Sequence, residues 1–438
     1  MGRVLPTRSS PVRARRARLG GGLSADFWRL LGSAAAANLA DGIAFIAIQL
    51  IAVRLGAAPA ELAGIGIAQR LPMMALGLIA GGLADRADRR RTMVAIQIFR
   101  VAVIGTLAAL AVTENLSILA LVAAALALGV GEAFFDTNSQ AIVPMVAGKE
   151  RLVPANGRLY AIETLMGSFV GPPIGAFLVA ISIAIALTSA AFAFALAAIG
   201  LALLAGTYRP EPTGRRRTLA VEIAEGVRFL GRHRLLATLT SMVALQHMGS
   251  AALLFLLPLY ALAPGPMGLT EPEFGLLFVA FGAGSLVASF VTGTLVAWLG
   301  RAGVLRLATV VLGVGLLMPA LTANVVVVGL SAFAVNAAFM AFGITNVSIR
   351  QAVTPPGLLG RVNATHRTVT YLAGLVGGVL AGAIGELVGL REAFAVGALI
   401  VMPGLLGGLV VTERAIERAE AAAGGPEGMT GRFVVDRT

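Results

Sequence analysis

Long apolar runs, separated by short polar stretches, dominate the chain. Each run holds about 20 mostly apolar residues, the length that an α-helix needs to cross the hydrocarbon core of a bilayer. The 438 residues contain twelve such runs, six on each side of a hydrophilic stretch from Tyr208 to Arg234. We expect spans at 27–53, 62–83, 93–113, 117–141, 159–181, 184–206, 236–262, 273–298, 304–323, 325–350, 367–389 and 392–412. The pattern predicts an all-α polytopic membrane protein with twelve transmembrane helices in two six-helix bundles.

The polar segments divide the chain into five parts. These are a basic N-terminus (1–26), a first bundle (27–207), a linker (208–235), a second bundle (236–412) and a tail (413–438). Within the linker, apolar residues recur at helical spacing with charges on the other face, at Leu219, Ile223, Val227 and Leu230. This spacing predicts an amphipathic helix that lies on the membrane surface.

Composition excludes several classes of protein. The chain is 58% hydrophobic and 13% charged, whereas soluble domains carry about 25% charged residues. It has no cysteine and three scattered histidines without ligand spacing, so we expect no disulfide, metal site or thiol nucleophile. Lys149 is the only lysine and lies outside any phosphate-binding loop, which excludes ATP hydrolysis by this chain. No Ser–His–Asp arrangement is present, and we therefore expect no enzyme and no cofactor.

Charge follows the polar loops in alternation. The net charge is +12, and arginines gather before the first span, after the second, in the linker, after the eighth and in the tail. In a membrane protein such a bias reports orientation rather than binding to nucleic acid. We therefore expect a multi-pass protein of the cell membrane with both termini in the cytoplasm.

The two halves repeat each other at several points. Gly81 and Leu83 after the second span correspond to Gly293 and Leu295 after the eighth, 212 residues later. The fifth span carries glycines at every fourth residue, and the eleventh repeats this ladder 207 residues on, at Gly374, Gly378 and Gly382. Parallel six-span repeats, with the substrate between them near the bilayer midplane, describe one transporter architecture.

The stretch GGLADRADRRRTM after the second span carries a resemblance to a known family. It resembles the signature loop of the major facilitator superfamily, with matches at Gly81, Leu83, Asp85, Arg86, Arg89 and Arg90. Asp88 stands where the family usually has glycine, a variant similar to the drug–proton antiporter branch that includes enterobactin and macrolide exporters. A carboxylate and arginines on a short loop can bind neighbouring helix ends, and we expect a reversible conformational latch here.

A second motif, GSFVGPPIGA in the fifth span, resembles the antiporter signature of the same family. The matching residues are Gly167, Gly171, Pro172 and Gly175, and Ala176 replaces the final glycine. In the family this signature accompanies export with proton exchange. Small residues allow close approach of helices and proline bends them, so we expect a tight but bendable contact between the half-bundles.

Charged residues inside the spans are functional candidates, because each costs about 2.5–3.5 kcal/mol to insert. Asp41 lies in the middle of the first span, and Glu132 and Asp136 lie one turn apart in the fourth. We expect Arg100 of the third span to pair with Asp136, which leaves Glu132 or Asp41 as the proton carrier. Further polar candidates for the cavity are Asn38, Arg70, Arg100, Gln246, His247 and Asn336. The arginine that the family often has in its fourth span has no counterpart in LALGVGEAFF.

These observations favour a secondary active exporter that uses the proton gradient. The resemblance implies proton antiport and alternating access, with drug, macrolide or siderophore-like substrates that are amphipathic or hydrophobic. The expected partners are a small-molecule substrate, protons and the lipid bilayer, and we expect a monomer. A facilitator or importer of a specific metabolite is the alternative on the same fold, and a non-transporting sensor or scaffold is a remote one.

Overall fold

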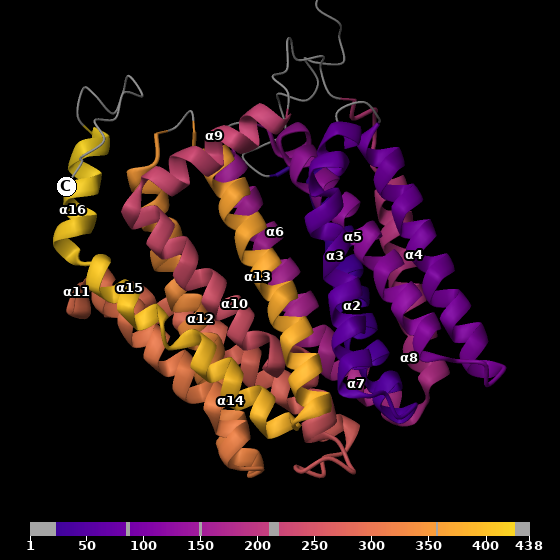
Figure 1. Ribbon diagram of the computed structural model, residues 1–438. Coiled ribbons are helices and arrows are strands. Elements are labelled where there is room, and N and C mark those ends of the chain that lie inside the picture. The colour runs from indigo at the N-terminus through magenta and orange to yellow at the C-terminus, as the bar shows by residue number, and fades with distance from the viewer. Residues whose placement is uncertain (1–22, 85–87, 149–150, 210–218, 356–357, 425–438) are drawn as a thin grey trace, which may run out of the picture.

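The computed structural model describes residues 23–84, 88–148, 151–209, 219–355 and 358–424, which are almost entirely helical (Figure 1). The first half consists of α2 (Ala25–Arg54), α3 (Pro59–Ala84), α4 (Arg89–Val112), α5 (Ile118–Ala147), α6 (Leu152–Thr164), the π-helix η3 (Leu165–Val170), α7 (Gly171–Ile181) and α8 (Ile183–Ala202). The second half consists of α9 (Leu219–Arg232), α10 (Arg234–Ala261), α11 (Glu271–Leu321), α12 (Val325–Val353), α13 (Leu359–Leu387), α14 (Leu390–Val401), α15 (Gly404–Val410) and α16 (Glu413–Gly424).

Ten helical stretches of the described residues are long and apolar enough to cross a membrane. One of them, α11, has 51 residues and breaks at Gly300, where φ is +71°, so it supplies two spans. The 26-residue helix α3 supplies the remaining span. Within each half the helices pack mainly on one another, α8 on α2 and α4, and α10 on α13 and α14. The all-α polytopic fold with two bundles, predicted from the hydrophobic pattern, is confirmed.

The fifth span departs from a regular helix where the sequence places its proline pair. The helix begins at Leu152, continues as the π-helix η3 and resumes as α7 at Gly171, followed by Pro172 and Pro173. Prolines lack the backbone N–H that an α-helix needs, so the turn before them loses its regular hydrogen bonds. The helix begins seven residues before the predicted start at 159.

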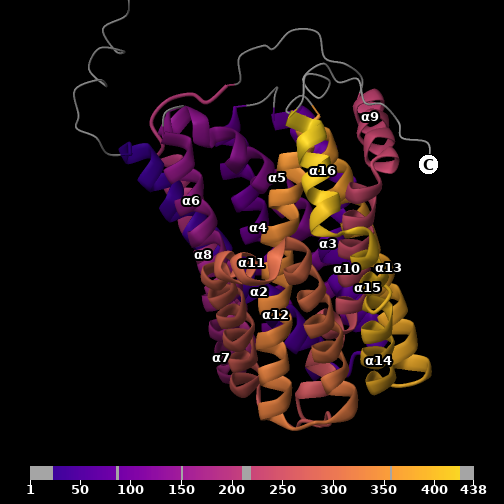
Figure 2. The same cartoon turned by 90° about the vertical axis from the view of Figure 1, so that its left-hand side faces the viewer.

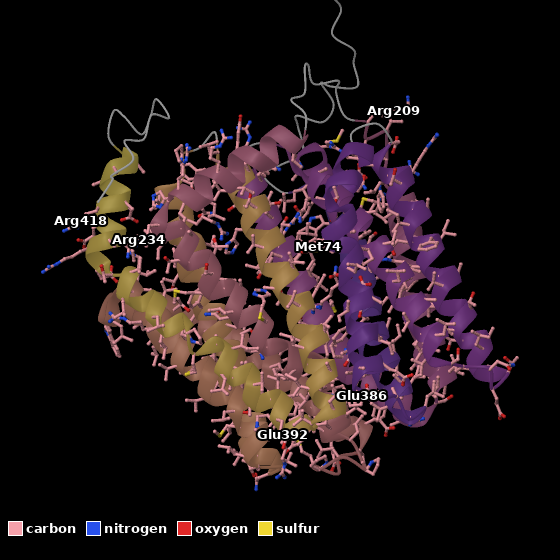
Figure 3. The ribbon with its side chains drawn as sticks, in the orientation of Figure 1. Met74, Arg209, Arg234, Glu386, Glu392 and Arg418 are labelled. Carbon is pink, nitrogen blue, oxygen red and sulfur yellow. The ribbon has the colours of Figure 1, made fainter. Side chains whose placement is uncertain are left out.

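The two ends of the molecule differ in charge (Figure 3). Arg209, Arg234 and Arg418 lie at one end, called here the arginine end, together with α9 and α16 (Figures 1 and 2). Glu386 and Glu392 lie at the other, called the glutamate end. This separation agrees with the alternation of charge along the chain.

The two bundles touch each other in the glutamate half of the molecule. Arg54 of α2 forms an ion pair with Glu271 of α11 at 2.8 Å, and the backbone N–H of Ala60 donates to Glu386 at 3.3 Å. The ring of Phe45 lies edge-on to Phe278, with centroids 6.5 Å apart. The described contacts between the bundles thus close the glutamate end.

Small residues allow this close approach. A Cβ on Gly382 of α13 would lie 2.9 Å from the side chain of Ala63, and a Cβ on Gly378 would lie 3.0 Å from that of Ile67. The glycines thus let α3 of the first bundle pack directly on the backbone of α13. The glycine ladder predicted in the eleventh span forms this contact between the bundles.

Candidate functional site

A layer of charged side chains crosses the interior of the first bundle. Its members come from four helices: Asp41 (α2), Arg100 (α4), Glu132 and Asp136 (α5), and Glu163 (α6). Counted from the helix ends at the arginine end, at 1.5 Å per residue, all five lie about 16 to 24 Å deep. Charged groups at this depth cannot reach the headgroup layer, so contacts within the protein must stabilise them.

Arg100 is the centre of this layer. Its side chain is fully buried and donates from Nη1 to Oδ2 of Asp41 at 3.1 Å. The guanidinium also lies 5.5 Å from the ring centre of Phe135 and 5.2 Å from that of Phe194. Such cation–π contacts are worth about 2 kcal/mol or more when the cation is desolvated. A Cβ on Gly131 would lie 2.7 Å from Nε of Arg100, so glycine is needed there.

The expected pair between Arg100 and Asp136 was wrong, because Arg100 bonds to Asp41 instead. The depth of the three residues along their helices places them in one layer. Which of them form an ion pair also depends on the direction in which each side chain points. The guanidinium lies between the rings of Phe135 and Phe194 and reaches α2 from there.

Three carboxylates of the layer, Glu132, Asp136 and Glu163, form no ion pair among the described residues. Asp136 interacts electrostatically with Glu132, Asp41 and Glu163, and only Arg100 opposes them. Among the described residues no cation lies within ion-pair distance of Glu132, Asp136 or Glu163. Carboxylates that repel one another in an apolar surrounding can take up protons or attract a cationic group.

The layer is accessible although it lies in the middle of the spans. The side chain of Asp41 is 26% exposed, and Glu132, Asp136 and Glu163 are all partly exposed. The described contacts between the bundles lie in the glutamate half. Asn38, one turn before Asp41, is also partly exposed and donates to the carbonyl of Ala34 at 2.9 Å.

Glu163 was missed from the sequence. A span predicted to begin at 159 places this residue four positions inside the membrane boundary, where a carboxylate is ordinary. The helix begins at Leu152 instead, which moves Glu163 about two turns deeper. Arg151 directly precedes α6 and Arg158 lies within it, and neither shares a helix face with Glu163, so no local pattern indicated this residue.

The second bundle contributes polar rather than acidic groups. His247 of α10 interacts electrostatically with Arg70 of α3 across the bundle interface. The imidazole Nδ1 lies 3.0 Å from the carbonyl of Val243, and its ring contacts Phe339 at 5.0 Å. The two remaining candidates, Gln246 and Asn336, lie on α10 and α12.

Gln246 and Asn336 differ in their bonding. Gln246 is buried, and its amide nitrogen has no described partner. Asn336 is partly exposed and donates to the carbonyl of Ala332 at 3.2 Å. Neither joins the charged layer of the first bundle through a described hydrogen bond, and no ion pair among the described residues links the second bundle to that layer.

Part of the signature loop is seen bound to neighbouring helix ends. Arg89 Nη1 donates to the carbonyl of Ala141 on α5 at 2.6 Å, and Arg90 donates to the carbonyl of Ala202 on α8. Asp85 and Arg86 lie outside the described residues, and of Gly81 and Leu83 only the backbone, at the end of α3, is described. The described arginines thus tie α4 to two helices of its own bundle.

The glycine motif of the fifth span makes a different contact from the one expected. A Cβ on Gly171 would lie 2.8 Å from Cα of Gly42, and Gly175 packs as closely on Ile43, both in α2 of the same bundle. Gly167 and Pro172 face the same helix. The expected contact between half-bundles is therefore wrong for the glycines, because the ladder faces inward.

Neighbouring residues of the motif make the contact between the bundles. A Cβ on Gly275 of α11 would lie 2.9 Å from Cβ of Ala176 and 3.3 Å from Cα of Pro173. Phe169 of η3 packs on Gly282 of α11. The irregular fifth span thus packs against α2 on one face and against α11 on the other.

No group of three or more His, Asp or Glu side chains in the described part of the chain is arranged to hold a metal ion.

Comparison with known proteins gives one family and several exporters. A family model described as transmembrane secretion effector matches residues 22–430. The multidrug efflux pump Tap of Mycolicibacterium fortuitum is 26% identical over 398 residues, which cover 87% of this chain and 93% of Tap. The enterobactin exporter EntS of Salmonella choleraesuis (strain SC-B67) is 28% identical over 357 residues, covering 78% of this chain and 81% of EntS.

Solved structures of low sequence identity share the fold. A bacterial homolog of the human lysosomal transporter Spinster, in an inward-facing and occupied conformation, matches with a TM-score of 0.70 at 12% identity. That match covers 94% of this chain and 98% of the other. The nucleoside transporter NupG matches with a TM-score of 0.68 at 12% identity, over 88% of this chain and 99% of NupG.

Proposed function

The chain belongs to the transmembrane secretion effector family of the major facilitator superfamily, and we propose that it exports amphipathic or hydrophobic small molecules by proton antiport. It is a multi-pass membrane transporter and not an enzyme. Drug and siderophore exporters among its relatives support the direction of transport that we propose. One chain contains both bundles, and we propose that a monomer is the working unit.

The single observation that carries the proposal is the excess of carboxylates in the accessible layer. The layer holds four acidic side chains and one buried arginine, and three of these acids have no ion-pair partner among the described residues. Arg100 keeps Asp41 in place, so Glu132 and Asp136 are the groups that exchange protons. A substrate that carries a positive charge competes with protons for this layer, which couples the two flows.

Alternating access follows from where the bundles touch. With the glutamate end closed by contacts such as Arg54–Glu271, the layer accepts substrate from the arginine end. The positive-inside bias places the arginine end in the cytoplasm, so this conformation is inward-open. When the glutamate end opens, protons from outside replace the substrate on Glu132 and Asp136, and the protonated carrier returns.

The test is transport into everted membrane vesicles energised by a proton gradient. We expect uptake of lipophilic cations such as ethidium to collapse with a protonophore. Glu132→Gln and Asp136→Asn should each reduce gradient-driven uptake at least tenfold. Glu114→Gln, which changes an exposed carboxylate in the loop after α4, is the matched control and should transport normally.

Two results would contradict the proposal. Uptake by the wild type that ignores the protonophore would indicate a facilitator. Full gradient-driven uptake in a Glu132→Gln/Asp136→Asn double variant would move the coupling to Asp41 or Glu163.

A further inference from the structure

A cavity of about 430 Å³ opens at the arginine end of the second bundle. Its walls come from the end of α9, the first three turns of α10 and the start of α15. Because α15 packs on α10 and α11, the cavity lies on the perimeter of the second bundle, away from the charged layer. Figure 2 shows α9, α10 and α15 on one side of the molecule.

The sequence explains why this space is empty of side chains. Pro403 interrupts the last span, which continues as α15 from Gly404. Gly404 and Gly407 then present backbone rather than side chain to α10. A Cβ on Gly407 would lie 2.8 Å from Cγ of Met242, so the backbone of α15 closes the floor of the cavity.

Two arginines stand at the rim of the cavity. Arg232 ends α9 and Arg234 begins α10, and both side chains are exposed (Figure 3 labels Arg234). No carboxylate of the described residues forms an ion pair with either. Partial burial lowers the pKa of His233 between them, whose Nδ1 receives the N–H of Leu236. The rim is thus cationic through its arginines alone.

The cavity changes from cationic to apolar with depth. From Arg234 to Leu245 the helix rises about 16 Å, which reaches from the headgroup layer into the hydrocarbon. Met242 and Leu245 line the deeper part, with Ser241 as an exposed hydroxyl between them and the rim. The first residue of α10 is also the first residue of a membrane span, which sets the rim at headgroup height.

We propose that this cavity binds an anionic phospholipid, with the phosphodiester between Arg232 and Arg234 and the start of an acyl chain against Met242 and Leu245. Basic pockets between transmembrane helices suit anionic headgroups, and the apolar lower part has no use for a free phosphate ion. The lipid belongs to the leaflet at the arginine end.

The bound lipid joins elements that move with the second bundle. Glu225 of α9 is ion-paired with Arg361 of α13, and a Cβ on Gly226 would lie 2.8 Å from the carbonyl oxygen of Arg361. A lipid at the junction of α9 and α10 therefore braces the linker helix on the bundle where it already rests.

The experiment compares purified full-length protein in nanodiscs of phosphatidylcholine and in nanodiscs with phosphatidylglycerol added. We expect phosphatidylglycerol to raise the melting temperature of the wild type, and Arg232→Ala/Arg234→Ala to lose at least half of that rise. Native mass spectrometry should show one retained phosphatidylglycerol fewer in this variant. Arg418→Ala removes an exposed arginine at the same end that does not line the cavity, and should behave as wild type.

A second variant separates a lipid from a small anion. Ser241→Phe fills the apolar approach and leaves both arginines, so it should also lose the retained lipid. If inorganic phosphate stabilises the detergent-solubilised protein equally and Ser241→Phe has no effect, the site takes a small anion and the proposal is wrong. An equal loss in Arg418→Ala would also overturn it, since surface charge alone would then explain the effect. Circular dichroism confirms that each variant is folded.

Discussion

The helix after the signature loop and its counterpart in the second half begin in different ways. Asp88 caps α4 by accepting the backbone N–H of Arg91 at 3.2 Å. At the equivalent position, 212 residues later, the chain has Gly300, which offers no side chain. The N–H of Ala302 donates instead to Oε1 of Glu413, a residue of the C-terminal helix α16, at 2.6 Å.

The arginine that follows is kept in both halves, but its partner changes. Arg89 donates to a backbone carbonyl of α5. Its equivalent Arg301 binds both oxygens of Glu420 and lies 3.8 Å from Glu413. A Cβ at Gly300 would lie 3.0 Å from Cδ of Glu413, so glycine leaves room for the visiting carboxylate. The second half has Gly300 at the position equivalent to Asp88, and Glu413 and Glu420 of α16 provide the carboxylates there.

The interiors of the two bundles also differ in how their polar side chains are paired. The first holds an ion pair, Arg100–Asp41, whereas the second holds neutral hydrogen bonds such as Thr240 with His366 at 3.0 Å. The first half thus pairs its buried arginine with a carboxylate, whereas the buried Arg350 of the second half donates to the neutral amide oxygen of Asn363 at 2.7 Å. This difference can be tested by substitutions of decreasing effect.

The largest effect is expected for Asp41→Asn. It removes the anionic partner of a fully buried guanidinium, and breaking a buried pair costs about 3–5 kcal/mol. Thr240→Val removes a neutral hydrogen bond from the second bundle and should cost about 1 kcal/mol. Thermal unfolding in detergent compares the two. Equal destabilisation would show that the charge in the first interior adds nothing beyond a hydrogen bond.

The next effect concerns the two helix starts. Asp88→Ala and Glu413→Ala each remove one cap and should each lower the free energy of unfolding by about 1–2 kcal/mol. Their local consequences differ, because only Glu413→Ala loosens α16. Trypsin should therefore cut at the exposed Arg414 and Arg418 several times faster in Glu413→Ala and at the wild-type rate in Asp88→Ala. Equal cleavage in both variants would refute the borrowed cap.

The sequence predicted the spans and the equivalence of the two loops, but not the contacts that the loops make. Periodicity and charge alternation predict the spans, and the offset between Gly81 and Gly293 identifies the two loops as equivalents. Nothing local indicates that Glu413 caps Ala302, because the two are 111 residues apart and meet only in the packed bundle. The amphipathic linker helix was predictable, since its period of apolar residues is a local property.

In the site, too, the residues were predictable from the sequence and their partners were not. Asp41, Glu132 and Asp136 could be identified as intramembrane acids from the sequence, because each lies within a predicted apolar span. The partner of Arg100 was not predictable, since it depends on the rotation of α4 between the rings of Phe135 and Phe194. Glu163 was missed because one helix starts about two turns early.

A smaller effect is expected for the ion pair between Arg301 and Glu420. The two side chains are 26% and 28% exposed, so solvent screens much of their attraction. A double-mutant cycle with Arg301→Ala and Glu420→Ala should give a coupling of about 1 kcal/mol. The equivalent cycle between Arg89→Ala and Glu420→Ala is the control and should give none, because Arg89 binds within its own bundle. A coupling of similar size in both cycles would mean that α16 acts through overall charge.

The smallest effect concerns Arg54 and Glu271, whose ion pair joins the two halves instead of stabilising one. Their side chains are 38% and 23% exposed, and such pairs contribute about 0–1 kcal/mol. Arg54→Gln should therefore increase the population open at the glutamate end by up to about fivefold. The chain has no cysteine, so an Ile67→Cys variant can report this opening through its rate of maleimide labelling.

The matched control is Arg391→Gln, an exposed arginine of the glutamate end without a described ion pair. We expect faster labelling with Arg54→Gln and an unchanged rate with Arg391→Gln. Contacts that cross between the halves must be weak enough to break in each transport cycle, whereas the loop contacts stay within one half and can be stronger. A labelling rate raised a hundredfold by Arg54→Gln would make this pair as strong as a buried one and would remove that distinction.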